Sequence, residues 1–179
     1  VTPADVLALV RGFTTHHEIP IVLLTYCNPV LQMGWERFAQ EARSAGADGV
    51  ILVDLPPEEA EEWKRAAAEY ELDTIFLVAP TSTDERIEWV AHNSLGFIYC
   101  VSRTGVTGVR EQLPPKLTQM IQHIRSLTDK PLVAGFGVSS PEQVDAVCRV
   151  ADGAVVGSAI VELVSKKRGK ADLEDATVD

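Results

Sequence analysis

The chain has 179 residues, of which 46% are hydrophobic and 23% are charged, and its formal net charge is −10 at pH 7. This length and composition predict one globular domain with a substantial core, and the acidic balance argues against a nucleic-acid-binding surface. No stretch approaches the roughly 20 apolar residues of a membrane helix, and the N-terminal segment lacks the pattern of a signal peptide. We therefore expect neither a nucleic-acid partner nor a membrane partner, and a cytoplasmic location.

The cysteines and histidines do not suggest a metal site or a covalent catalyst. Cys27, Cys100 and Cys148 show no CxxC spacing, and the four histidines form no HExxH pattern. Isolated cysteines of this kind are expected to be reduced thiols, most of them buried. Because no Ser-His-Asp or Cys-His set stands at suggestive positions either, the sequence predicts neither a metal centre nor a covalent nucleophile.

Apolar runs and helical patterns alternate along the chain, beginning with a helix. Thr2 is predicted to cap that helix, with Pro3 at its first position and Asp5 in its first turn. Strands are expected over residues 20–26, 49–54, 73–79, 96–101, 131–137 and 152–158. Helices are expected over residues 34–46, 56–70, 82–92, 114–128, 140–150 and 159–169.

Two of these helices carry a capping-box pattern at their start, in which a serine is followed three residues later by Glu or Gln. The first pair is Ser82 and Glu85, and the second is Ser140 and Gln143. Pro141 also stands at the first position of the second helix. Helices are therefore expected to begin directly after each serine.

Strands that are apolar on both faces and alternate with helices indicate parallel βαβ units. The architecture is then either an open doubly wound sheet or a (β/α)8 barrel. A barrel uses about 30 residues for each unit, so 179 residues hold about six of the eight units. The sequence thus predicts a single domain over residues 1–179, and a barrel of this length is incomplete.

Glycines follow three of the expected strands, in residues 105–108, 134–138 and 156–160. A bound phosphate needs several backbone N–H groups and a close approach of the main chain, which glycine permits. In barrels the loops after the last two strands form the recurrent phosphate site, so Gly135, Gly137, Gly157 and Ser158 are candidates for binding one anion. The structural alternative makes Gly137 a turn glycine and Ser158 the cap of the last helix.

Three other polar residues have both a structural and a functional interpretation. Tyr99 is either a core tyrosine or a residue that faces a substrate near the glycine loop. Asp54 either ties the start of the helix expected from Pro56 or faces a ligand, and Arg103 either clamps an anion or lies in solvent. The residues alone leave these alternatives open.

Five stretches together resemble the tryptophan synthase alpha subunit family: IYCVSRTGVTG, AGFGVSSPEQV, GAVVGSAIV, LLTYCNPV and VILVDLPPEEA. The resemblance implies a (β/α)8 TIM barrel, represented here by about six units, incomplete at both ends and with two exposed sheet edges. The reaction it implies is the cleavage of indole-3-glycerol phosphate to indole and glyceraldehyde 3-phosphate in tryptophan biosynthesis. It implies no cofactor in this chain. It also implies an alpha2beta2 type complex with a beta subunit, which receives the indole and alone uses pyridoxal phosphate.

The resemblance also implies roles for individual residues. Tyr99 matches a supporting active-site tyrosine, and Arg103 and Thr107 lie in a mobile loop that closes over the substrate. Asn28 and Pro56 match positions that face the beta subunit. The matched phosphate-binding residues are Gly108, Gly135, Gly137, Gly157 and Ser158, and the matched pocket residues are Leu24, Tyr26, Ile51, Leu77 and Phe136.

One departure from the family pattern concerns the catalytic acids. The family's general acid/base glutamate and the aspartate that holds the indole N–H match no residue of this chain. Retro-aldol cleavage needs a positioned carboxylate, so the 179 residues alone are predicted to be inactive. The alternatives are a stand-alone indole-3-glycerol phosphate lyase, a non-catalytic regulatory partner of the beta subunit, and a phosphate-binding barrel isomerase, against which SRTGVTG weighs.

Overall fold

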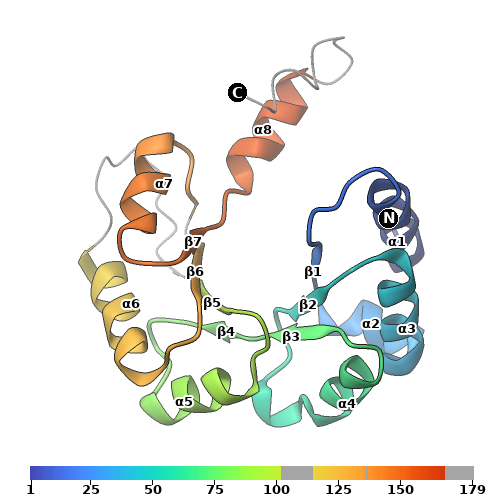
Figure 1. Ribbon diagram of the computed structural model, residues 1–179, viewed down its shortest axis with the longest axis horizontal. Helices are drawn as coiled ribbons and strands as arrows, with labels where there is room; N and C mark the ends of the chain where they lie inside the picture. The colour runs from blue at the N-terminus through green and yellow to red at the C-terminus, as the bar shows by residue number, and fades with distance from the viewer. Residues whose placement is uncertain (102–114, 136, 168–179) are drawn as a thin grey trace. The chain divides into compact units, whose positions relative to one another are not determined.

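A computed structural model describes residues 1–101, 115–135 and 137–167 (Figure 1). The chain forms two compact units. Unit 1 comprises Val1–Leu77 and Glu85–Ile98, and unit 2 comprises Val78–Asp84 and Tyr99–Asp179. The expectation of a single domain over the whole chain stays a prediction.

Unit 1 is built on a three-stranded parallel sheet in the order β1-β2-β3. The central strand pairs in register with both neighbours, Val22 lying opposite Gly49 and Gly49 opposite Asp73. All four residues of β2 are buried, as the apolar run predicts. The elements of this unit are α1 (Pro3–Thr14), β1 (Val22–Thr25), α2 (Cys27–Met33), α3 (Trp35–Ala45), β2 (Gly49–Leu52), the 3-10 helix η1 (Pro57–Glu59), α4 (Glu61–Glu69), β3 (Asp73–Ile75) and, apart from its first residue, α5 (Asp84–Asn93).

Helices α3 and α4 enclose an aromatic cluster in unit 1. The ring centroid of Trp63 lies 5.8 Å from that of Trp35 and 6.0 Å from that of Phe38. Trp63 and Ala39 are fully buried. Together with the buried residues of β2, this cluster forms the core that holds the helices on the sheet.

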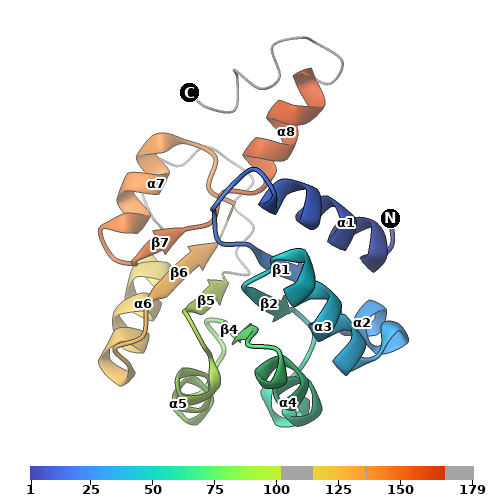
Figure 2. The ribbon, with the colours of Figure 1, turned by 45° about the vertical axis from the view of Figure 1, so that its right-hand side comes forward.

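Unit 2 contains most of a four-stranded sheet in the order β4-β5-β6-β7, and the boundary between the units runs through β4 and β5. Strands β6 and β7 pair in parallel, with Val133 opposite Gly153. The last helix, α8, has no buried residue and projects away from α6 and α7 (Figures 1 and 2). The remaining elements are β4 (Leu77–Val78), β5 (Ile98–Val101), α6 (Pro115–Leu127), β6 (Leu132–Gly135), α7 (Pro141–Cys148), β7 (Gly153–Ala154) and α8 (Ser158–Lys167).

Two predicted helix starts are confirmed and one is wrong. Thr2 caps α1 in a capping box with Asp5, and Ser140 caps α7 in the predicted box with Gln143. Helix α5 instead begins at Asp84, so its cap position falls on the residue after Ser82. The Ser82 hydroxyl accepts a hydrogen bond from the backbone N–H of Ala79 (3.1 Å), which uses it in the preceding turn.

Helix α2 was not predicted from the sequence. The dipeptide Asn28-Pro29 reads as the end of a strand, yet the chain enters a helix at Cys27. Pro29 is the third residue of that helix, where the backbone N–H has no partner inside the helix and its absence costs nothing. A proline directly after a strand is therefore compatible with a helix start, which the sequence analysis did not predict here.

The predicted strand over residues 73–79 is interrupted at Phe76. Its backbone N–H donates to the hydroxyl of Ser94 (3.1 Å), and its ring packs edge-on against Trp89 at 5.3 Å. This side-chain bond takes the place of a ladder bond, so β3 ends at Ile75 and β4 begins at Leu77. The predicted helix over 56–70 is also divided, into η1 and α4.

The described chain contains six strand-to-helix units after α1, as predicted, if β3 and β4 are counted as one interrupted strand. All three cysteines are free, but only Cys100 is buried, Cys27 is half-buried and Cys148 is exposed. The expectation that most of them are buried is therefore wrong. Among the described helices, none is long and apolar enough to cross a membrane.

Candidate phosphate site at the ends of β6 and β7

The ends of β6 and β7 bring together four of the predicted phosphate-binding residues. Because the two strands are parallel neighbours, their carboxyl ends lie at the same edge of the sheet. The backbone N–H of Val155 donates to the carbonyl of Ala134 (2.9 Å), which continues the pairing past β7. Gly135 ends β6 and Gly137 comes two residues later, while Gly157 and Ser158 follow β7.

Two of the glycines at this edge, Gly137 and Gly157, have open space beside them among the described residues. Gly137 has a φ of +84°, a backbone conformation that residues with a side chain rarely adopt, so its turn role is real. A Cβ on Gly137 or Gly157 would meet no atom within 4 Å among the described residues. None of the described residues blocks the approach of a ligand to either backbone, so the turn role and the proposed binding role are compatible.

Ser158 is the first residue of α8 rather than the residue before it. The cap position is therefore taken by Gly157, which has no side chain that could accept hydrogen bonds from the first N–H groups of the helix. Unpaired N–H groups and the helix dipole favour an anion at this point. Ser158 adds a hydroxyl beside them.

Tyr99 lies against Gly135. A Cβ built on Gly135 would overlap the Tyr99 hydroxyl and stand 2.9 Å from two ring carbons, so any larger residue here would force the Tyr99 ring to shift. Tyr99 is half-buried on β5, and burial raises the pKa of its phenol. The hydroxyl therefore stays protonated at neutral pH and lies beside the candidate phosphate edge, although a role in the chemistry stays a prediction.

Four predicted pocket residues lie in unit 1. Leu24 on β1 is paired in register with Ile51 on β2, so both side chains point to the same face of the sheet. Leu24 is 57% exposed and Ile51 is buried. Tyr26, directly after β1, is exposed, and Leu77 is the first residue of β4.

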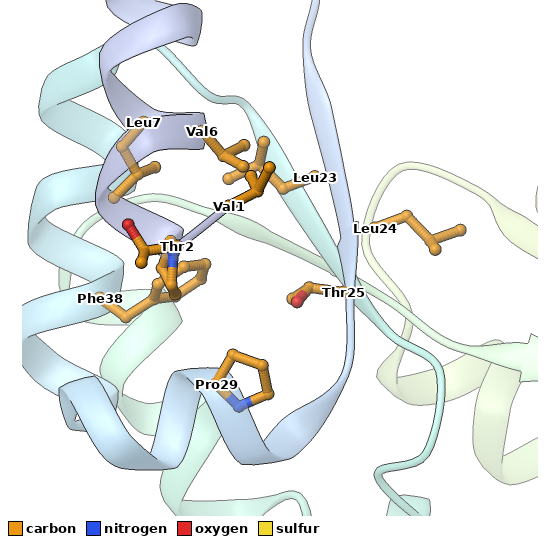
Figure 3. A pocket seen from close by; sticks show the side chains of 10 residues that line it. Val1, Thr2, Val6, Leu7, Leu23, Leu24, Thr25, Pro29 and Phe38 are labelled. Carbon is orange, nitrogen blue, oxygen red and sulfur yellow. The ribbon is translucent and has the colours of Figure 1, made fainter. Parts of the chain in front are cut away.

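A cavity of about 170 Å³ lies on unit 1 beside β1 (Figure 3). Leu23 points toward α1 on this side, whereas Leu24 extends from the opposite side of the strand (Figure 3). Leu24 is the one predicted site residue among those that line the cavity, which are Val1, Thr2, Pro3, Val6, Leu7, Leu23, Leu24, Thr25, Pro29 and Phe38.

Asp54 ties the start of a helix, but not of the helix that was expected. Its Oδ1 accepts the backbone N–H of Cys27 (2.7 Å), so the tied helix is α2 and not the one that follows Asp54 in the sequence. Burial, and then the negative charges of Asp54 and Glu59, raise the pKa of the Cys27 thiol. Asn28 is exposed on α2, and Pro56 directly precedes η1.

Four predicted site residues lie outside the described residues: Arg103, Thr107, Gly108 and Phe136. Their roles remain those that the resemblance implies. The sequence analysis did not single out Leu31 and Gln32, which are exposed. They share a face of α2 with Asn28, and this could not be seen because α2 was not predicted.

The family model of the tryptophan synthase alpha chain matches residues 1–178. The chain belongs to this family. The tryptophan synthase alpha chain of Geotalea uraniireducens is 52% identical over 168 residues, which are 94% of this chain and 63% of that protein. The alpha chain of Carboxydothermus hydrogenoformans is 46% identical over 162 residues, 90% of this chain and 61% of that protein. This tryptophan synthase alpha family chain thus spans less than two thirds of the length of either relative.

Solved tryptophan synthase structures have the same fold. The crystal structure of the alpha chain from Legionella pneumophila matches with a TM-score of 0.88 and 34% identity, covering 99% of this chain and 66% of that one. The tryptophan synthase a2b2 complex of Pyrococcus furiosus matches with a TM-score of 0.91 and 35% identity, covering 99% of this chain and 72% of that one. The predicted fold class, a (β/α)8 barrel represented by part of its units, is confirmed.

Proposed function

We propose that the protein to which these residues belong is a tryptophan synthase alpha chain, a lyase that cleaves indole-3-glycerol phosphate to indole and glyceraldehyde 3-phosphate. Family membership supports the reaction. The observation that carries the proposal is the pairing of β6 with β7, which sets Gly135, Gly137, Gly157 and Ser158 at one edge of a sheet. That edge suits the substrate's phosphate, which the backbone N–H groups and the start of α8 can bind.

Phosphate binding at this edge serves the reaction by fixing the far end of the substrate. Energy from a non-reacting phosphate can hold the glycerol chain in the orientation that bond cleavage requires. The protonated Tyr99 hydroxyl, which lies over Gly135, is suited to contact the substrate near that anchor. The apolar pair of Leu24 and Ile51 offers a surface of the kind that an indole ring requires.

Cleavage also needs a group that delivers a proton to indole C3 and one that removes a proton from the glycerol hydroxyl. The resemblance assigns this work to a glutamate that matches no residue of the chain. The 179 residues alone are therefore expected to bind glycerol phosphate weakly and to release no indole. We propose no cofactor for the alpha chain itself.

We further propose a beta subunit as partner, because one of the solved relatives is a tryptophan synthase a2b2 complex. The beta subunit would take up the indole and carry pyridoxal phosphate. On this chain, Asn28 on α2 and Pro56 before η1 are the proposed contact residues.

The direct test is indole release from indole-3-glycerol phosphate by the native protein, with and without the beta subunit of the same source. Indole release that the beta subunit stimulates is the expected result. Indole release without any response to a beta subunit would indicate a stand-alone lyase, and no release under either condition would leave the non-catalytic partner. The 179-residue chain, assayed in parallel, is expected to show no turnover.

A further inference from the structure

Two carboxylates flank β2, and each accepts a hydrogen bond at one end of β1. Asp48, directly before β2, accepts the backbone N–H of Ile21 through Oδ2 (2.8 Å). Asp54, two residues after β2, accepts the backbone N–H of Cys27 through Oδ1 (2.7 Å). The two bonds have the same chemistry and the same sequence separation, but they hold opposite ends of the same strand pair.

The bond from Asp54 differs in what it positions, because Cys27 is the first residue of α2. Tyr26, at the cap position, makes no side-chain cap bond in the structure. The first N–H of this short helix therefore takes its partner from the end of the neighbouring strand. A carboxylate at a helix start is also favoured by the helix dipole, so Asp54 fixes where α2 begins and how it is oriented.

Helix α2 presents a neutral face to the surface. Val30 is fully buried and anchors the inner side of the helix, whereas Asn28, Leu31 and Gln32 are exposed and share one face. Residues 19–35 include no charged side chain, in a chain whose net charge is −10. Neutral surface with an exposed leucine is typical of the centre of a protein–protein interface, where charged residues are depleted.

We propose that Asp54 is a positioning residue for the partner subunit: its carboxylate holds α2 so that the face of Asn28, Leu31 and Gln32 docks on the beta subunit. This inference rests on the proposed function. The bond from Asp54 joins the two segments that carry the proposed contact residues, since Cys27 adjoins Asn28 and Asp54 stands two residues before Pro56. Preorganised supports of this kind decide how well a contact surface binds.

The test measures beta-subunit affinity by titration calorimetry, with the native protein and its own beta subunit. Asp54→Ala is expected to weaken binding about tenfold and to reduce stimulation of indole release by the beta subunit. Asp54→Asn is expected to recover most of the affinity, because its amide oxygen can accept the same N–H. The matched control is Asp48→Ala, which removes the equivalent bond at the other end of β1 and should lower the melting temperature while the beta affinity stays within twofold of wild type.

A second variant tests the docking face without touching the bond. Leu31→Lys changes an exposed side chain, so the protein is expected to fold with an unchanged melting temperature and to bind the beta subunit at least about tenfold more weakly. Wild-type affinity of Leu31→Lys, or equal losses of affinity in Asp48→Ala and Asp54→Ala, would overturn the inference while the proposed function stands. Wild-type protein that releases no indole and binds no beta subunit would overturn both.

Discussion

At the scale of single residues, Gly135 and Gly157 illustrate two different reasons for a glycine at the candidate phosphate edge. Gly135 has no room for a side chain, because the Tyr99 ring and hydroxyl occupy the space of its Cβ. Gly157 has open space around the position of its Cβ. The first glycine is therefore required by packing within unit 2, whereas the second leaves its backbone open to the proposed ligand.

Replacing each glycine with alanine separates these two reasons. Gly135→Ala is expected to lower the free energy of unfolding by about 1–3 kcal/mol, because Tyr99 must shift. Gly157→Ala, the matched control, is expected to change it by less than about 0.5 kcal/mol. Chemical denaturation of the two variants checks this, and equal losses of stability would contradict the packing at Gly135.

Cys100 gives the protein a pH dependence at alkaline pH. Burial raises the pKa of its thiol to about 12 from an ordinary value of 9.0. The folded state therefore keeps the thiol protonated where the unfolded chain ionises it. The resulting contribution to stability is complete below pH 9 and is lost as the pH rises from 9 toward 12.

The expected slope from this one group is a loss of up to about 1.4 kcal/mol for each pH unit above 9. Urea denaturation at several pH values between 8 and 10.5 measures it, with Cys100→Ala expected to show a shallower decline than wild type. Cys148→Ala, which removes an exposed thiol, serves as the control. Equal slopes in all three proteins would show that Cys100 does not ionise differently on unfolding.

At the scale of elements, Asp152 joins β6, β7 and α6. Its carboxylate accepts the backbone N–H of Leu132 at the start of β6 (2.7 Å) and pairs with Arg125 on α6. The hydrogen bond from Arg125, and then that from Leu132, hold the pKa of Asp152 below its ordinary value. The register of the two strands that carry the candidate phosphate residues is fixed in part by this carboxylate.

Asp152→Ala is expected to destabilise the protein by about 1–2 kcal/mol at neutral pH. Because the folded pKa is lowered, this contribution is present above the ordinary pKa of 3.8 and is lost as the pH falls below it. Thermal melts of wild type and Asp152→Ala at pH 7 and pH 3 check the sign: the difference between the proteins should shrink in acid. A difference that is the same at both pH values would contradict it.

Much of the element order could be predicted, because buried parallel strands and capped helices leave strong local patterns. The box of Ser140 with Gln143 specifies α7 without any tertiary contact. Helix α2 could not be predicted, since its start depends on Asp54, a residue 27 positions later. The interruption at Phe76 likewise depends on a bond to Ser94, 18 positions later.

The candidate site could likewise be predicted only in part. Gly135, Gly137, Gly157 and Ser158 were found because small residues at strand ends are visible in the sequence and parallel pairing brings them together. The contact of Tyr99 with Gly135 and the exposed face of α2 could not be predicted from the sequence. Both arise from distances across elements, which local patterns do not encode.

At the scale of the whole molecule, the part of the chain that the structure describes leaves strands unpaired on one side. In the described sheets β1 pairs only with β2, and β7 stands at the end of its sheet. No residue of β1 is charged, and charged residues are the usual protection of an edge strand. The edge of β1 is therefore open to pairing.

The 179-residue chain, studied by itself, is accordingly expected to self-associate. Sedimentation velocity at increasing protein concentration should show species larger than one chain, and Leu24→Lys, which places a charge on the exposed edge strand, should reduce them. A single species of monomer mass at all concentrations would contradict the account of an open edge.

The most direct test of the account as a whole is the KM for indole-3-glycerol phosphate of Gly157→Asp in the native protein. A carboxylate at the proposed phosphate edge should repel the substrate, so the KM is expected to rise at least about tenfold. Gly12→Asp, another position with open space around it but on α1, is the control and should keep the wild-type KM. A KM for Gly157→Asp equal to that of wild type would contradict the placement of the substrate's phosphate at the ends of β6 and β7.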